Sequence, residues 1–286
     1  MKIFFFLLLL VLQIYAQPKW KRTEKISKAK ITLFHGTQTA NFPTTESLGK
    51  GNWMYEISHR FTVPIKNGFD ALWGFDGPAK IKFAVGYGIS DNLMINFGRS
   101  NLTDNYDLQL KQKIYEFNNK KFPTAISVLG GIAWNSEIPN NIVRNKLAAD
   151  NFQFYSMLIF NTMLFNKKVG FGLIPSYVYN SFIYAVQKQY TFSIGTYFHY
   201  YINRMWSVWI EHNAIITGYH GKIRLDESGR SYNTVSFGAS LETGGHIFNF
   251  VITNNSRLNY SQFLIGANNS AQNNFWKLGF GIIRYF

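Results

Sequence analysis

The chain has 286 residues, enough for one large domain or two small ones. Hydrophobic residues make up 47% of it, yet the mean hydropathy is only -0.10, so apolar residues are spread along the chain rather than gathered in long runs. The absence of cysteine excludes a disulfide framework, a thiolate metal site and a catalytic cysteine. The net charge of +14 comes from dispersed basic residues without a nucleic-acid-binding motif, so we expect no nucleic-acid partner.

The first 16 residues have the pattern of a secretory signal peptide. Lys2 precedes an apolar run over residues 3–12, and Ala16 is a suitable last residue before cleavage. An uncleaved anchor is the alternative, but this run is too short to cross a bilayer. We therefore expect the mature protein to be exported.

Residues 17–51 form a second segment, which we interpret as a periplasmic arm or a plug. Its first part, to residue 30, is strongly basic and either contacts anionic lipid or a partner, or is a solvated terminus. Its second part, residues 31–51, is rich in Thr, Gly and Asn. This part is either a tether or a short plug of a lumen, and the sequence leaves both pairs of alternatives open.

From Trp53 onward the chain alternates between large apolar residues and small or polar ones. Ile81, Phe83 and Val85, for example, alternate with Lys82 and Ala84. A period of two predicts β-strands with one face for hydrocarbon and one for a polar interior. The pattern occurs in twelve segments: residues 53–63, 79–89, 92–100, 106–117, 124–135, 151–165, 168–180, 189–202, 204–216, 232–242, 246–255 and 275–286.

The connections between these segments alternate in length. Short turns, such as residues 202–205, are separated by mostly longer links, such as residues 136–150, and only residues 101–105 break the rhythm. This alternation is typical of outer-membrane barrels, with short periplasmic turns and long extracellular loops. A soluble β-sandwich is the competing fold, but it gives no reason for such regularity. The last segment ends on Phe286 and must pair with the first, since an open sheet edge cannot be left in lipid.

Charge supports the same fold, because charged residues concentrate on the predicted inner face. The outer face carries only Arg99, Glu116 and Arg284, each near a strand end where a long side chain can reach water. A charge facing lipid at the middle of the membrane costs about 2–4 kcal/mol. We predict an all-β fold for residues 52–286: a closed antiparallel transmembrane barrel of about 12 strands, monomeric and located in the bacterial outer membrane.

Several short motifs, in this order and spacing, resemble a family of outer-membrane β-barrel proteins of Bacteroidetes that is defined only as a domain of unknown function. They are residues 56–61 (EISHRF), 74–78 (GFDGP), 86–92 (GYGISDN), 98–100 (GRS), 175–180 (PSYVYN), 242–251 (ETGGHIFNFV) and the closing GFGIIRYF. The resemblance covers roughly residues 34–286. It implies a barrel and an outer-membrane location, but no activity and no ligand.

No enzymatic, metal or cofactor motif is present: there is no HExxH, GxSxG or P-loop. One group of residues is compatible with an enzyme. Across the turn at residues 202–205, Tyr197 can face Glu211 and His199 can face Trp209, with Ser207 nearby. An outer-membrane lipid esterase could use such a Ser, His and acid. An interior hydrogen-bonded layer is the more ordinary interpretation, so we predict no catalytic, cofactor or metal residues.

We expect passive or ligand-selective passage of small anionic solutes. The alternative is a non-conducting barrel that serves as a scaffold or accessory for a periplasmic or surface partner. Twelve strands fall between filled eight-stranded barrels and open channels of sixteen or more, so strand number does not decide. The other expected partners are outer-membrane lipid and the barrel assembly machinery.

The candidate anion site lies on three strands that closure makes neighbours, near the outer mouth. It consists of Arg60, Lys80, Lys82 and Lys277. Acidic loop residues such as Asp70 and Asp76 could instead fold inward and cancel this charge. Five further polar residues are expected in the lumen: Glu56, Lys111, Lys113, His199 and Glu211.

Overall fold

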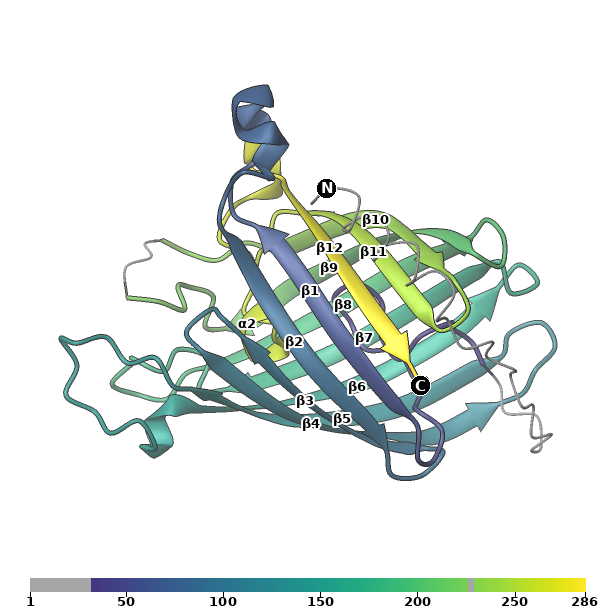
Figure 1. Cartoon of the computed structure of the whole chain (residues 1–286). Coiled ribbons are helices and arrows are strands. Elements are labelled where there is room, and N and C mark those ends of the chain that lie inside the picture. The colour runs from purple at the N-terminus through teal and green to yellow at the C-terminus, as the bar shows by residue number, and fades with distance from the viewer. Residues whose placement is uncertain (1–31, 226–228) are drawn as a thin grey trace, which may run out of the picture. The chain divides into compact units, whose positions relative to one another are not determined.

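The computed structural model describes residues 32–225 and 229–286. The expected signal peptide and the basic arm up to residue 30 lie outside the described residues. Twelve antiparallel strands close into a barrel in which each strand pairs with its neighbours in sequence and β1 pairs with β12 (Figure 1). The predicted fold class is therefore confirmed.

The strands are β1 (Trp53–Phe61), β2 (Ala79–Gly88), β3 (Leu93–Ser100), β4 (Asn105–Phe117), β5 (Thr124–Asn135), β6 (Phe152–Leu164), β7 (Val169–Tyr179), β8 (Tyr190–Tyr201), β9 (Trp206–Gly218), β10 (Thr234–Glu242), β11 (His246–Thr253) and β12 (Lys277–Tyr285). The connections contain the short helices η1 (Ile65–Asn67), η2 (Phe69–Gly74), η3 (Ala149–Asn151), α2 (Tyr260–Phe263) and η4 (Ala271–Asn273). No helix in the described part of the chain is both long and apolar enough to cross a bilayer.

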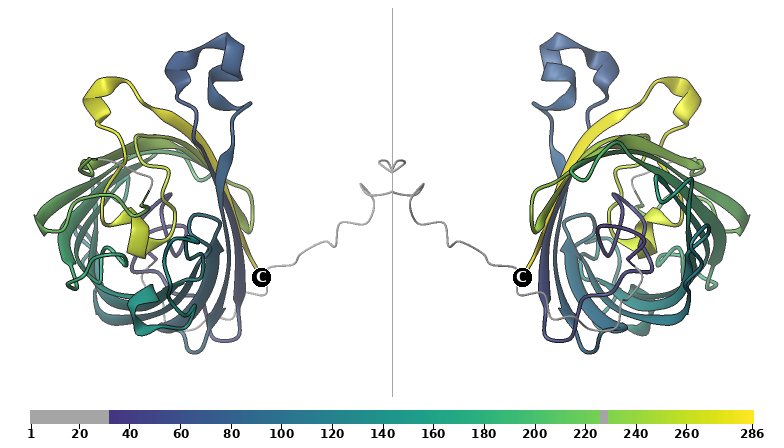
Figure 2. Two further views of the ribbon diagram at one scale, coloured as in Figure 1. Left: turned by 90° about the vertical axis from the view of Figure 1, so that its left-hand side faces the viewer. Right: turned by 90° about the vertical axis from the view of Figure 1, so that its right-hand side faces the viewer.

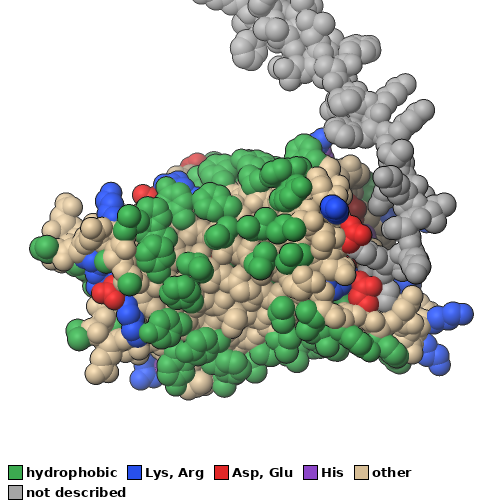
Figure 3. All heavy atoms as spheres, turned by 90° about the horizontal axis from the view of Figure 1, so that it is seen from below, with side chains coloured by type: hydrophobic (Ala, Val, Ile, Leu, Met, Phe, Trp, Pro, Cys, Tyr) green, Lys and Arg blue, Asp and Glu red, His purple; other side chains and the backbone are tan. Residues whose placement is uncertain are grey.

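The alternation in the sequence becomes two faces of the barrel wall. On β1, Trp53 and Tyr55 are exposed while Met54, Glu56 and Arg60 are buried. Figure 3 shows one side of the wall, where hydrophobic side chains cover the middle and charged ones gather towards both ends. The outer face therefore suits lipid, and the inner face encloses the lumen.

The prediction that Glu116 lies on the outer face is wrong. The register of β4 against β5 shifts between Lys113 and Tyr115, so an extra residue is inserted there. Such a bulge moves every later side chain to the opposite face. Glu116 consequently pairs with Ala125, which is buried, and its carboxylate lies 2.8 Å from the Lys113 ammonium inside the barrel.

The N-terminal segment lies inside the ring of strands, and we call residues 32–50 the plug (Figure 2). Its centre is a narrow hairpin, in which Gln38 pairs with Pro43 and the Thr39 amide donates to the Phe42 carbonyl at 2.8 Å. The tip of this hairpin is Ala40 and Asn41. The plug is not part of the β-sheet that forms the wall, which begins at β1.

The connection between β11 and β12 also enters the lumen, whereas the alternation in connection length predicts an extracellular loop here. Every residue from 254 to 266 is buried, including helix α2. The ring of Phe263 meets that of plug residue Phe42 at 5.3 Å between centroids. We call residues 254–267 the inner loop, and with the plug it fills the barrel.

A charge on the lipid face should destabilise the barrel in a depth-dependent way. Phe83 lies at the middle of β2 and faces outward, whereas Phe117 faces outward at the end of β4. Phe83→Lys is expected to lower the free energy of unfolding in lipid vesicles by about 2–4 kcal/mol and Phe117→Lys by about 0–1 kcal/mol, measured by urea titration. Equal losses would show that the outer wall does not contact hydrocarbon as described.

Candidate functional site: the plugged lumen

The lumen has an uncharged half and a charged half. Strands β5 to β8 contain no Asp, Glu, Lys or Arg. Large apolar side chains line this half: Leu129, Tyr155, Met157, Ile159, Ile174, Val178 and Tyr197. The buried charged groups of the wall come from the other strands: Glu56, Arg60, Lys82, Asp107, Lys111, Lys113, Glu211 and Lys277.

The uncharged half holds the aromatic residues of the plug. Phe34 and Phe42 lie 5.5 Å and 6.3 Å from the Tyr197 ring, measured between centroids. Glycines in the wall leave space for these rings, because a Cβ on Gly170 would come within 2.5 Å of Phe34 and one on Gly195 within 2.4 Å of Phe42. This half of the wall is thus shaped to fit the plug.

Lys111 on β4 holds the two arms of the plug hairpin together. Its buried ammonium donates to the carbonyl oxygens of Thr37 at 2.7 Å and Thr44 at 3.0 Å. Across the lumen, the Thr45 amide donates to the Asn161 side chain at 2.8 Å. The plug is therefore tied to β4 and β6 partly through its own backbone.

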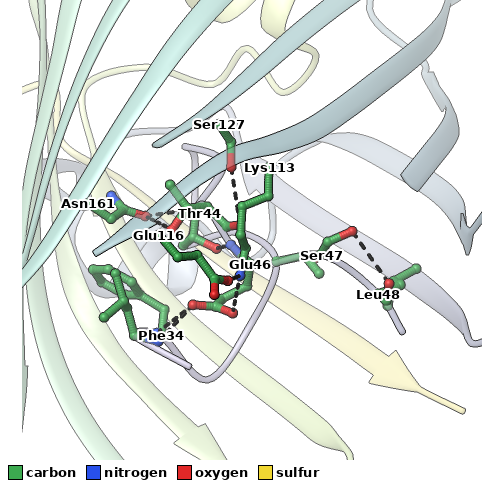
Figure 4. A network of polar contacts seen from close by, with 12 residues as sticks. Phe34, Thr44, Glu46, Ser47, Leu48, Lys113, Glu116, Ser127 and Asn161 are labelled. Atoms are coloured by element: carbon green, nitrogen blue, oxygen red, sulfur yellow. Dashed lines mark hydrogen bonds and ion pairs between the residues drawn. The ribbon is translucent and has the colours of Figure 1, made fainter. Parts of the chain in front are cut away.

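A second group of contacts surrounds Glu46, the charged anchor of the plug (Figure 4). One carboxylate oxygen accepts from the Leu33 amide at 2.7 Å, and the other lies 3.6 Å from the Lys113 ammonium. Lys113 also contacts Glu116, so one cation is shared by two carboxylates. The two expected lumen lysines, Lys111 and Lys113, thus both bind the plug.

The tip of the plug bridges Arg60 on β1 and Glu211 on β9. The Arg60 guanidinium donates to the Ala40 carbonyl at 3.2 Å and to the Asn41 side-chain oxygen at 3.0 Å. The amide of Asn41 donates to Glu211 at 3.2 Å, and its side-chain nitrogen donates to the other oxygen of this carboxylate. An uncharged backbone turn therefore stands between a buried cation and a buried anion.

The structure brings the four candidate cations to one side of the barrel. Lys80 pairs with Arg60 across β1 and β2, and β12, which carries Lys277, is the other neighbour of β1. Lys82 forms a 2.9 Å ion pair with Glu56, so part of the charge is neutralised inside the wall. Arg60, Lys82 and Lys277 are buried and Lys80 is half-buried.

Two kinds of residue could change the charge of this cluster: the acidic residues of the β1–β2 connection and Tyr260 of the inner loop. Asp70 and Asp76 lie exposed on the β1–β2 connection rather than folded into the lumen. Tyr260 of the inner loop lies against Lys82, whose ammonium is 5.7 Å from the ring centroid. Burial raises the pKa of the Tyr260 phenol well above its usual range, so this ring adds no charge to the site.

Ser207, His199 and Glu211 do not form the Ser–His–acid triad of a hydrolase. His199 Nε2 lies 2.7 Å from Ser207 Oγ, as a nucleophile and base would. The Glu211 carboxylate, however, is bound to plug residue Asn41, and His199 Nδ1 has no hydrogen-bond partner within the described residues. In that same part of the chain no group of three or more His, Asp or Glu side chains could hold a metal ion.

The anchor of the plug can be tested directly. Glu46→Ala removes the acceptor of the Leu33 amide and the partner of Lys113, a loss of about 1.5–3 kcal/mol for a hydrogen bond to a charged group. Amide hydrogen exchange across residues 33–46 should then accelerate roughly tenfold to a hundredfold, by mass spectrometry. Glu116→Ala, which leaves the bonds of Glu46 intact, is the matched control, and equal protection in both variants would contradict the anchoring role.

A family model described as "Membrane bound beta barrel domain" (DUF5777) matches residues 34–286. Among solved structures, an outer membrane channel from Pseudomonas putida F1 is similar with a TM-score of 0.51 and 10% identity, covering 85% of this chain and 98% of that one. The NanC porin is similar with a TM-score of 0.48 and 8% identity, covering 82% and 99%. The outer membrane phospholipase A from Escherichia coli has a TM-score of 0.40 and 12% identity, covering 87% and 95%. No curated protein matches the chain.

Proposed function

We propose that this chain, which belongs to the membrane-bound β-barrel domain family, is an outer-membrane channel closed by its own plug. Small anionic solutes would pass along the charged half of the lumen once the plug has moved. The single observation that carries the proposal is the division of the lumen. One half is an uncharged seat for the aromatic rings of the plug, and the other half is lined by charged groups that bind the plug and that water and ions would solvate once it has moved.

The contacts of Arg60 support the proposal that the transported solutes are anions. In the plugged state its guanidinium donates to two oxygens of the plug tip, from Ala40 and Asn41, and to the His59 carbonyl of its own strand. Withdrawal of the tip would remove two of these acceptors from a buried cation, which is costly unless another acceptor replaces them. An anion supplies such oxygens, and Lys80 and Lys277 on the neighbouring strands add positive potential at the same place.

The neighbour from Pseudomonas putida F1 is described as an outer membrane channel, and its barrel fold is compatible with the same role here. We place the protein in the outer membrane as a monomer, inserted by the barrel assembly machinery. Its origin in Bacteroidetes stays a prediction. We propose no esterase activity, because within residues 32–225 and 229–286 no acid bonds to the distal ring nitrogen of His199, the partner of Ser207.

A non-conducting scaffold is the second candidate, and the filled lumen favours it. The plug and the inner loop share one buried cluster with the wall, including Phe42, Phe263 and Tyr197. A barrel packed in this way could simply support a partner through its loops. In that case the charged half of the lumen would serve only to bind the plug.

Conductance of the purified protein in a planar bilayer separates the two candidates. The channel proposal predicts discrete current steps, rare in the intact protein, with a reversal potential under a salt gradient that shows anion preference. A correctly folded barrel that remains silent in every variant that displaces the plug would support the scaffold instead. Folding is checked independently by β-type circular dichroism and by heat-modifiable migration in gels.

A further inference from the structure

The connection between β1 and β2 forms a small lobe, residues 62–78, that contains η1 and η2. Figure 1 and Figure 2 show it outside the ring of strands, beyond the ends of β1 and β2. It is attached to the chain before β12, since the Ile65 amide donates to the Trp276 carbonyl at 2.8 Å. The Lys66 ammonium lies 3.3 Å from the centroid of the Phe275 ring. The lobe therefore stands beside the barrel at its long-loop end and does not cover the lumen.

Four large apolar side chains of the lobe are exposed. Phe69 is 71% exposed and Phe75 is 54% exposed, and Leu72 and Trp73 are also accessible. Leu72 and Trp73 both have left-handed backbone conformations, with φ of 43° and 51°. Each costs about 1–3 kcal/mol in a residue other than glycine. The chain thus adopts a strained turn that exposes apolar side chains to water. Such exposure is unusual unless lipid or another protein covers the side chains.

Contacts between rings join the lobe to the outer wall of the barrel. Phe75 meets Phe61 edge to face at 5.0 Å, and Phe61 lies 6.1 Å from Phe280. Phe61 and Phe280 belong to the outward faces of β1 and β12, which face lipid. The apolar surface of the lobe is therefore continuous with the lipid-facing belt.

We propose that the lobe is an interfacial anchor, with Phe69, Leu72, Trp73 and Phe75 inserted into the lipid surface next to the barrel. Aromatic side chains favour this region of a membrane, and charged ones such as Lys66 and Asp70 remain at the level of the headgroups. Because the lobe is joined to the two strands that close the barrel, the anchor fixes the height of the β12–β1–β2 wall in the membrane. This role is independent of conduction through the lumen.

Single-cysteine variants test the anchor cleanly, because the natural chain has no cysteine. Phe69→Cys and Trp73→Cys each carry an environment-sensitive fluorophore in liposomes of neutral phospholipid, and Val143→Cys is the control. Val143 is fully exposed on the β5–β6 connection, at the same end of the barrel. We expect lipid-borne nitroxides near the headgroups to remove most of the fluorescence at positions 69 and 73, and aqueous iodide to remove little. The control should show the reverse.

Two outcomes would overturn the proposal. In one, the probes at 69 and 73 are quenched by iodide as strongly as the control is. In the other, they are accessible in liposomes but shielded in native membranes, which would mean that a protein covers the lobe. Because the Phe69 side chain is 71% exposed, its replacement removes little packing, so misfolding at position 73 would not spoil the test.

Discussion

Deletion of residues 32–50 is expected to turn a barrel that is almost always closed into one that conducts persistently. The deletion removes Phe34 and Phe42 from the uncharged half and the tip residues from between Arg60 and Glu211. If the unplugged form of the intact protein is a minor state populated at roughly 0.1–10%, the open probability should rise by about 10- to 1000-fold. Single-channel recording in planar bilayers measures this directly.

The deletion removes the two plug carbonyls from Lys111, Glu46 from Lys113 and the tip oxygens from Arg60, so folding must be checked in the same preparation. Heat-modifiable migration and β-type circular dichroism serve this purpose. Glu46→Ala provides a milder variant, because it weakens the plug while leaving its chain in place. A folded barrel that stays silent both after the deletion and in Glu46→Ala would contradict the gating role of the plug.

Replacing all four candidate cations by glutamine should reduce the preference for anions in the unplugged barrel. Arg60→Gln, Lys80→Gln, Lys82→Gln and Lys277→Gln together remove four positive charges from adjoining strands β1, β2 and β12. Focused positive potential raises the local anion concentration about tenfold or more, so the anion-to-cation permeability ratio should fall by roughly that factor. The measurement is the shift in reversal potential under a salt gradient.

The control for this variant follows from the Glu56–Lys82 ion pair. Replacing Lys82 while keeping Glu56, as the fourfold variant does, leaves a buried carboxylate without its cation, which costs about 3–5 kcal/mol, so folding of that variant is checked by heat-modifiable migration. The double variant Glu56→Gln with Lys82→Gln removes one charge of each sign and should leave the reversal potential nearly unchanged. A reversal potential that stays the same in the fourfold variant as well would show that the basic cluster is only structural.

The wall of the barrel could be predicted from sequence because its signal is local. Each strand alternates with a period of two, and the lengths of the connections distinguish the two ends. The error at Glu116 arose because one inserted residue near Ile114 reverses the alternation, and nothing in the local composition marks that bulge. Residues facing the lumen could thus be assigned strand by strand, except beyond an irregularity.

The sequence left open whether residues 31–51 form a tether or a plug, because a segment that packs inside a barrel has no periodic signature. The plug is held partly through backbone groups, such as the carbonyls of Thr37 and Thr44, which any sequence would offer. The inner loop did carry a signal, since Phe263, Leu264 and Ile265 form an apolar run in an otherwise polar connection. The partners of Arg60 and Lys113 depend on the plug, and so the site could be assembled only from the structure.

The most direct test of the account is a reversible cross-link between the plug and the wall. Thr45 and Asn161 suit this purpose, because their side-chain oxygens lie 3.1 Å apart and the chain has no cysteine of its own. The double variant Thr45→Cys with Asn161→Cys should show no current steps when oxidised and should regain openings when reduced, while Thr45→Cys alone should not respond to the redox change. Openings that are equally frequent in the oxidised and reduced double variant would contradict the claim that the plug gates the lumen.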